Sequence, residues 1–240
     1  QAIGEKLEKT LPHVMLSYKV NPEAREYERT SVTVLNASVA PLVGDYLKRI
    51  ESEASLGENL QIFHSSRGMA SPEAVCERPL SMALSGPAAG VSAAARTARM
   101  LRYDRVLSFD MGGTTTVVCL VLIAQAEISD NRVLAGLELR QPMVAVHSIG
   151  AGGGSIVRVG PGGITVGPES AGAFPGPAWY GLGGLEPTIT DVNVVLGYFN
   201  LSRRLGGEIQ LDRRKAIRAL EPLANRLNMD VIDFALGVWR

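Results

Sequence analysis

The segment Ser108–Thr116, SFDMGGTTT, decides the fold that we expect for this chain. The apolar run Arg105–Phe109 predicts a strand that delivers Asp110 to its end, and two glycines then allow a tight turn. Three threonines follow, each with a hydroxyl and a backbone N–H group. Proteins hold a phosphate beside a metal ion in this way, because amides and hydroxyls bind the anion while a carboxylate binds the cation or its water. The alternative is an ordinary β-turn with a polar tip, and the Gly-Lys-Ser/Thr of a Walker loop is absent from this segment.

A second glycine cluster lies at Ile149–Ser155, IGAGGGS, after an apolar stretch and His147. Glycines at this density cannot stabilise the interior of a helix or strand, so we expect the backbone to wrap closely around a neighbour here. A third segment, Leu84–Val91, predicts a helix start with Ser85 as its cap and Pro87 in its first turn. Such an N-terminus can bind an anion, although a well-capped, closely packed helix is the favoured interpretation.

The composition is that of a globular protein with balanced charge. The 240 residues include 24 basic and 24 acidic side chains, and 46% are hydrophobic. Zero net charge argues against nucleic acid or an anionic membrane as the main partner, and no apolar run approaches the length of a membrane span. Cys76 and Cys119 are far apart in sequence, which favours two incidental thiols in a cytoplasmic protein.

The order of elements predicts a mixed α/β chain. Asn36 is expected to cap a helix reaching about Ser55, Asp191 a helix reaching about Tyr198, and Asp212 a third helix. Another helix is expected at Pro87–Leu101, and residues 167–187 are expected to form a long loop. Strands are expected at Val14–Val20, Leu60–Phe63, Val106–Asp110, Thr116–Ala124, Ser155–Val159 and Ile164–Val166. The chain does not begin with Met and ends within a helix-like stretch, so we expect a fragment of a longer protein.

Taken together, the motifs resemble those of the hydantoinase A/5-oxoprolinase family, which includes the ATP-dependent acetone and acetophenone carboxylases. They occur in the family's order over about residues 14 to 240. Each is weak alone, but the set is specific. The matching segments are Arg25–Thr30, Ser85–Val91, Asp110–Thr114, His147–Ser155, Val166–Gly172 and Glu186–Asp191.

The resemblance implies an α/β, actin-like ATPase fold of the ribonuclease H-like type, with a mixed sheet and flanking helices. Residues 1–240 would form the core domain, without the family's amino-terminal lobe, which carries the first hairpin of a two-lobed ATP cleft. Family members use ATP to phosphorylate a carbonyl or enolate oxygen of a cyclic amide, such as a hydantoin or 5-oxoproline, or of a ketone. The implied cofactors are ATP and Mg²⁺, with a second divalent metal as a further possibility.

The resemblance also assigns site residues. Asp110 would orient Mg²⁺ or its water, and His147 would be a metal ligand or a substrate-side group, the alternative being a hydrogen-bonded core histidine. The phosphate would be held by Gly112, Gly113, Thr114 and Thr115. The nucleotide cleft would be lined by Gly150, Gly152, Gly153, Gly154 and Ser155.

Four positions depart from the family's pattern. Val117, Ala145 and Phe174 replace acidic residues, and Leu182 replaces an arginine. An apolar side chain can neither ligate a hard cation nor accept a proton, so a metal site built from Asp and His would lose most of its ligands. The pattern indicates a retained scaffold with altered or lost chemistry.

Three functions are compatible with these observations. The first is part of an ATP-dependent hydrolase of cyclic amides, acting on a small-molecule substrate with the amino-terminal lobe and a hydantoinase B-type subunit as partners. The second is a catalytically degenerate structural or interaction subunit, and the third is a subunit of an ATP-dependent ketone carboxylase. A sugar or acetate kinase of the same superfamily fits less well, because Val166–Gly172 and Glu186–Asp191 have no counterpart there.

Overall fold

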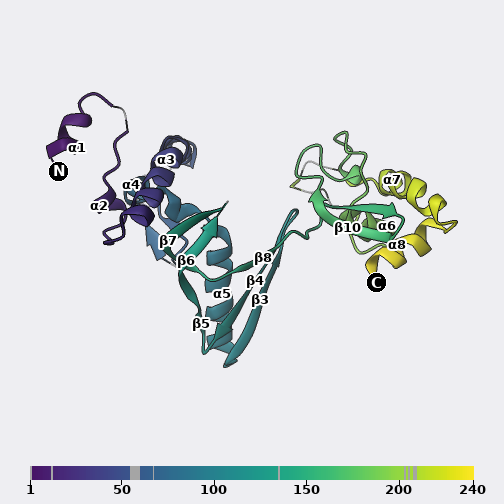
Figure 1. Cartoon of the computed structure of the whole chain (residues 1–240). Coiled ribbons are helices and arrows are strands. Elements are labelled where there is room, and N and C mark those ends of the chain that lie inside the picture. Colours follow the sequence, from purple (N-terminus) through teal and green to yellow (C-terminus); the bar gives the residue numbers. More distant parts are fainter. Residues whose placement is uncertain are drawn as a thin grey trace. The chain divides into compact units, whose positions relative to one another are not determined.

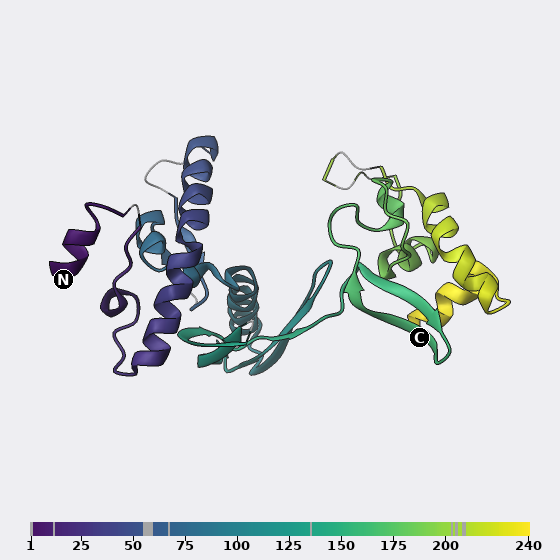
Figure 2. The ribbon, with the colours of Figure 1, turned by 45° about the horizontal axis from the view of Figure 1, so that its top comes forward.

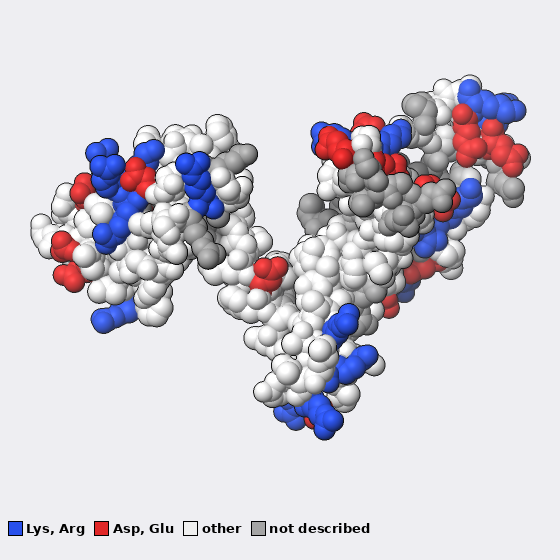
Figure 3. All heavy atoms as spheres, turned by 180° about the vertical axis from the view of Figure 1, so that it is seen from behind, with Lys and Arg blue, Asp and Glu red and all other residues white. Residues whose placement is uncertain are grey.

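The computed structural model describes residues 2–11, 13–54, 60–66, 68–134, 136–202, 204, 206–207 and 210–240. They form two compact units, of which the first comprises residues 1–108 and 119–146 and the second residues 109–118 and 147–240 (Figure 1). On the face shown in Figure 3, both units carry basic and acidic side chains, in keeping with the balanced composition. No helix within the described ranges combines the length and apolarity needed to cross a membrane.

The first unit is built around the long helix α3, Glu26–Ala54. This helix begins ten residues before the predicted cap Asn36, which instead lies inside it, and the predicted end at Ser55 lies outside the described residues. The predicted strand Val14–Val20 is wrong: its last four residues form the short helix α2, Ser17–Val20. Val20 packs there with Val32 of α3 in the core of the unit, so tertiary contacts override its local β preference.

Helix α5, Ser85–Leu101, confirms the predicted alanine-rich helix. Its buried residues are Ala88, Val91, Ala95 and Ala98, which recur at helical spacing. Ser85 is not its cap: the N-cap is Leu84, at a positive φ of 60°, and it makes no side-chain capping bond. The smaller helices of this unit are α1 (Ala2–Leu7), α4 (Pro72–Glu77) and the 3₁₀ turn η2 (Pro79–Met82).

Two antiparallel hairpins complete the first unit. The first joins β1, Ile62–His64, to β2, Gly68–Ala70, close to the predicted strand Leu60–Phe63. The second joins β6, Ile128–Leu134, to β7, Leu137–Val144, and was not predicted. Leu139 and Met143 of β7 pack with Val20, Val32 and Leu80 in the core.

The hairpin predicted from SFDMGGTTT is confirmed as β3, Arg105–Met111, and β4, Thr116–Leu122. Strand β4 also pairs antiparallel with β5, Gln125–Ala126, and with β8, His147–Ile149, which gives a four-stranded sheet. The turn and the adjoining strand ends belong to the second unit, together with β8.

The second unit packs a twisted hairpin against three helices (Figure 2). The hairpin is β9, Ser155–Gly160, with β10, Gly163–Ser170, which extends four residues beyond the predicted Val166. The helices are α6 (Ile189–Val195), α7 (Arg213–Arg226) and α8 (Val231–Trp239), and the intervening loop contains the 3₁₀ turn η3 (Ala178–Tyr180). Ala216 and Leu220 of α7 and Phe234 of α8 are fully buried in the shared core, which confirms the predicted apolar face of α7.

One of the two helix caps predicted in the second unit is confirmed. The Asp212 side chain accepts from the Arg214 N–H group, as expected for the cap of α7. For α6 the N-cap is Thr188, and Asp191 is the third helical residue of a capping box rather than the cap itself. The sequence therefore placed this helix correctly and assigned its cap three residues too late.

Candidate functional site

The turn between β3 and β4 presents free donors to solvent. Residues 110–115 are all exposed, and the turn closes with a 2.9 Å hydrogen bond from the Gly112 N–H to the Thr115 carbonyl. The N–H groups of Gly113, Thr114 and Thr115 donate to no group in the described ranges. The Asp110 carboxylate likewise has no hydrogen bond or ion pair with any residue that the structure describes. These groups are available for an anion and a cation.

The glycine cluster rests on this turn. The Gly153 N–H donates to the Gly112 carbonyl at 3.0 Å, and the Gly154 N–H donates to the Gly113 carbonyl at 2.6 Å. A Cβ atom at Gly152 would lie 2.6 Å from the carbonyl carbon and oxygen of Gly113. The close neighbour that the sequence predicted for these glycines is thus the hairpin itself, within the second unit.

Hydroxyl groups hold the glycine loop in place. The Thr190 N–H and Oγ1 both donate to the Gly153 carbonyl, at 2.8 and 2.6 Å, and the Thr116 Oγ1 donates to the Ala151 carbonyl at 2.6 Å. The buried Ser155 Oγ accepts from the Gly152 N–H at 2.9 Å, so Ser155 stabilises the loop from within. The sequence analysis missed Thr190, because a threonine at the start of a helix carries no local sign of a partner 37 residues away.

Ser170, at the end of β10, approaches the turn from another side. Its Oγ lies 3.5 Å from the Gly113 carbonyl and 3.5 Å from the Thr114 Oγ1. The N–H of the next residue, Ala171, donates to the Gly154 carbonyl at 2.8 Å. The glycine loop and Ser170 thus contact the turn directly, Thr190 holds the glycine loop, and residues 110–115 stay exposed.

The donor set fits Mg²⁺ better than a metal held mainly by protein side chains. Mg²⁺ keeps several waters and takes one or two carboxylates together with phosphate oxygens, and Asp110 with the threonine hydroxyls offers such a set. His147 is exposed and pairs with Val118 across β8 and β4, so the predicted alternative of a core histidine is not supported. Within the described ranges, no group of three or more His, Cys, Asp or Glu side chains is placed to hold a metal ion.

The apolar substitutions noted in the sequence have different environments. Val117 pairs with Ser148 in the sheet, and Ala145 donates its N–H to the Glu127 carbonyl. Phe174 is 80% exposed and Leu182 is also exposed. Neither side chain therefore packs into a hydrophobic core in place of the charged residue of the family's pattern.

The Asp191 carboxylate links α6 by hydrogen bonds to its N-cap, Thr188, and to η3. Its carboxylate accepts from the Trp179 N–H at 2.9 Å and from the Thr188 N–H and Oγ1 at 2.9 and 2.8 Å. Burial raises the pKa of this carboxyl above its usual value, although the hydrogen bonds from Thr188 and Trp179 oppose that shift. Asp191 is therefore a structural residue of the loop and of α6.

Comparison with known proteins places this arrangement in a family. The hydantoinase/oxoprolinase family model matches residues 29–240. Caprolactamase subunit alpha of Pseudomonas jessenii is 38% identical over 235 residues, which cover 95% of this chain and 34% of that protein.

Two solved structures are similar over nearly the whole chain. A crystal structure of ATP-dependent caprolactamase from Pseudomonas jessenii has a TM-score of 0.73 at 37% identity, covering 99% of this chain and 36% of that one. A nucleotide-free structure of acetone carboxylase, described in terms of ATP-dependent acetone carboxylation, has a TM-score of 0.80 at 32% identity, covering 98% and 34%. The chain thus spans about a third of the length of these relatives. They confirm the α/β fold class, and the actin-like ATPase fold is consistent with the family. The chain belongs to the hydantoinase/oxoprolinase family.

Proposed function

We propose that this chain supplies the phosphate-binding part of an ATP-dependent enzyme that activates a cyclic amide. The observation that carries the proposal is the β3–β4 turn. It is exposed, its amides at Gly113, Thr114 and Thr115 are unbonded within the described residues, and Asp110 stands at the end of the preceding strand. The family membership supports the cyclic amide, because a caprolactam is one and a relative is named a caprolactamase.

In this proposal each part of the site has a separate task. Gly112, Gly113, Thr114 and Thr115 bind phosphate oxygens, and Asp110 orients Mg²⁺ or its water. The glycine loop Gly150–Ser155 lies against the turn and preorganises it, so that little reorganisation accompanies binding. His147 remains a candidate substrate-side group or a ligand of a second divalent metal.

ATP and Mg²⁺ would supply a phosphoryl group that makes the amide carbon reactive. Amide resonance makes uncatalysed hydrolysis slow, and transfer of phosphate to the carbonyl oxygen creates a good leaving group. The chain's own part in this step is to hold the phosphate in line with the substrate oxygen.

The proposed enzyme needs further parts. The relatives are about three times as long as this chain, and one is named as an alpha subunit. We propose an amino-terminal lobe that completes the ATP cleft and a B-type subunit as partner, with residues 1–240 as the core domain.

A second candidate function rests on the apolar substitutions. Val117, Ala145, Phe174 and Leu182 remove charged groups, which favours a catalytically degenerate structural or interaction subunit. The similarity to acetone carboxylase supports a third candidate, a subunit of an ATP-dependent ketone carboxylase.

Calorimetric titration of Mg·ATP into the chain tests the proposal. We expect saturable binding that Asp110→Ala weakens at least about tenfold, because the cation loses its carboxylate. The matched control is Asp130→Ala, which removes an exposed acid from β6 in the first unit. Equal binding by the wild-type and Asp110→Ala proteins would contradict the assignment of Asp110.

Activity assays on the full-length protein, together with the same titration, separate the remaining candidates. Turnover of a lactam with ATP supports the cyclic amide hydrolase, and ATP-dependent incorporation of bicarbonate into a ketone supports the carboxylase. ATP binding that is absent from the full-length protein as well would leave the interaction subunit as the function.

A further inference from the structure

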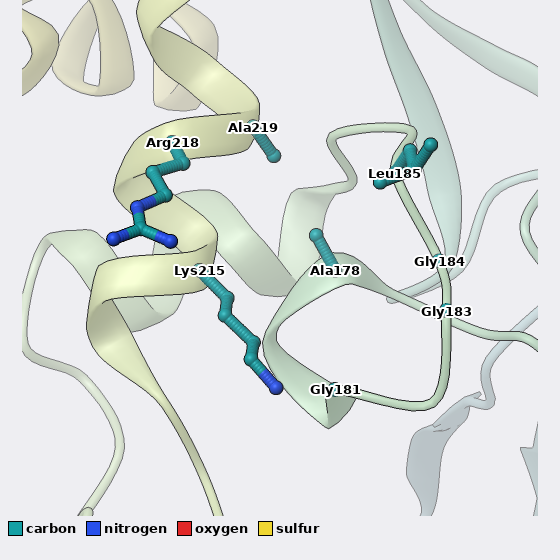
Figure 4. A pocket seen from close by; sticks show the side chains of 8 residues that line it. All are labelled: Ala178, Gly181, Gly183, Gly184, Leu185, Lys215, Arg218 and Ala219. Atoms are coloured by element: carbon teal, nitrogen blue, oxygen red, sulfur yellow. The ribbon is translucent and has the colours of Figure 1, made fainter.

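The second unit contains a cavity that shares no residue with the hairpin site. It has a volume of about 310 Å³ and lies between helix α7 and the loop that follows η3 (Figure 4). Its lining residues are Ala178, Gly181, Gly183, Gly184, Leu185, Lys215, Arg218 and Ala219. All of them lie in the second unit, so the cavity is a property of that unit alone.

The described residues that line the cavity carry positive charge. Lys215 and Arg218 are exposed, and no acidic residue of the described ranges lines the cavity. Neither side chain forms an ion pair or hydrogen bond with any residue that the structure describes. Like charges three residues apart on a helix repel one another, so an anion bound beside them would relieve an unfavourable contact.

Two other arginines of this unit are already engaged. Arg158 bonds to Glu169 and Glu186, at 2.5 and 3.2 Å, and Arg213 donates to the Val195 carbonyl at 2.8 Å. Lys215 and Arg218 differ from Arg158 and Arg213 in that their side-chain donors bond to no residue of the described ranges.

The loop of residues 181–185, which follows η3, supplies one preformed wall of the cavity. Gly181 and Gly183 have positive φ angles of 74° and 102°, and the N–H groups of Gly183 and Gly184 donate to no described group. Successive free amides in such a loop make a concave site for an anion. The loop shape is fixed by close contact, because a Cβ at Gly184 would overlap the Gly176 carbonyl oxygen.

The position of Lys215 also depends on this loop. Its ammonium group extends from α7 toward Gly181, where a Cβ atom would collide with the Nζ (Figure 4). The guanidinium of Arg218 is turned away from Leu185 in the same view, and an exposed arginine changes rotamer within nanoseconds. Lys215 thus points toward the loop in this structure, and Arg218 lines the same cavity.

The remaining wall is apolar. Ala178 and Ala219 line the cavity, and the 85% exposed Leu185 stands at its rim. An aliphatic group placed there would cover apolar surface that is now in water. We propose that this cavity binds a small organic carboxylate with a short aliphatic body, its head at Lys215, Arg218 and the loop amides and its body against the alanines and Leu185. The inference goes beyond the proposed function and does not rest on it.

An NMR titration of the whole chain tests the proposal with three probes. Butyrate carries the charge and the aliphatic body, butyramide keeps the shape without the charge, and inorganic phosphate keeps a charge without the body. We expect butyrate to shift the amide signals of Gly181, Gly183 and Gly184 saturably, with butyramide producing no saturable shift. Equal shifts from butyramide would overturn the proposal, because binding would then not depend on charge. Tighter binding of phosphate at the same amides would also overturn it, because the cavity would then prefer an inorganic anion to a carboxylate.

Variants test whether Lys215 and Arg218 are responsible for butyrate binding. Lys215→Met combined with Arg218→Gln is expected to weaken butyrate binding about tenfold, because two charge-assisted contacts are lost. Lys215→Arg should retain binding, and Arg226→Gln, in the last turn of the same helix, should leave it unchanged. Unchanged affinity in the double variant would overturn the proposal, provided that the rest of its spectrum matches the wild type. Asp110→Ala should bind butyrate normally, which separates this site from the proposed nucleotide site.

Discussion

At the scale of single residues, Gly152 shows why the glycine cluster is present. Its missing side chain lets the loop backbone touch the backbone of Gly113, where a Cβ would lie only 2.6 Å from the carbonyl group. The neighbouring atoms are backbone atoms, which cannot move aside as the end of a flexible side chain can. The glycine is therefore needed for contact with the turn, and through the turn for any ligand that the turn binds.

We expect Gly152→Ala to destabilise the protein by about 1–3 kcal/mol, the usual range for overpacking a close contact. Urea denaturation measures this loss. The matched control is Gly162→Ala, because a Cβ at Gly162 meets no atom of the described residues within 4 Å and its φ is not positive. A loss of the same size in both variants would show that the contact with Gly113 is not the cause.

The carboxyl group of Asp191 gives a prediction about pH. Burial raises its pKa in the native state, so the native protein binds this proton more tightly than the unfolded chain. The contribution of this group to stability is therefore fully present below the ordinary Asp pKa of about 3.9 and is lost as the pH rises through the native value. We expect the unfolding free energy of Asp191→Asn to lack the decrease with rising pH that this carboxyl group causes in the wild type.

The measurement is urea denaturation at a series of pH values from 3 upward, at about half-unit steps. Asp130→Asn, at an exposed position on β6, serves as the control, and its profile should parallel that of the wild type. Parallel profiles for the wild type and Asp191→Asn would contradict the raised pKa.

At the scale of elements, α3 and η2 are joined by one buried side chain. Asn36 lies inside α3 and is fully buried. Its Oδ1 accepts from the Leu80 N–H at 3.0 Å, and its Nδ2 donates to the Val32 carbonyl at 2.8 Å. The side chain thus satisfies a backbone donor at the start of a short 3₁₀ turn 44 residues away, which helix propensity alone cannot indicate.

We expect Asn36→Ala to cost about 1–3 kcal/mol, because the Leu80 N–H is left buried without an acceptor. Thermal unfolding by circular dichroism measures the loss. Ser38→Ala is the control, because its exposed hydroxyl donates to the Leu35 carbonyl of the same helix. If the two variants melt together, the link between α3 and η2 does not contribute to stability.

At the scale of the whole molecule, each unit has its own hydrophobic core. In the first unit Val20, Val32, Leu80, Leu139 and Met143 are buried together. In the second unit the core joins α6, α7 and α8 to β9 and to Trp179 of η3. A core substitution should therefore act first on the unit that contains it.

We expect Leu220→Ala to destabilise the second unit by about 2–5 kcal/mol, through the cavity left in its core. Hydrogen exchange followed by mass spectrometry should show faster exchange in α6, α7 and α8, with α3 and β7 unchanged. Val32→Ala, in the core of the first unit, should give faster exchange in α3 and β7 and leave α6, α7 and α8 unchanged. Uniformly faster exchange along the chain in either variant would show that the two units unfold as one.

The sequence by itself determined the features that depend on neighbours along the chain. The hairpin around Gly112 and Gly113 and the helices α5 and α7 follow from turn residues and apolar spacing, which are local physical signals. The family resemblance was also visible there, because it rests on short motifs in a fixed order.

Tertiary structure alone decided what those features contact. The partner of the glycine loop is the hairpin turn, the acceptor of the Leu80 N–H is Asn36, and Lys215 faces the loop at Gly181. The prediction of a strand at Val14–Val20 is wrong for the same reason, because packing against α3 places Val20 in the short helix α2. Hydrogen bonds and packing join residues that are distant along the chain, and local propensity is too weak to indicate which of them meet.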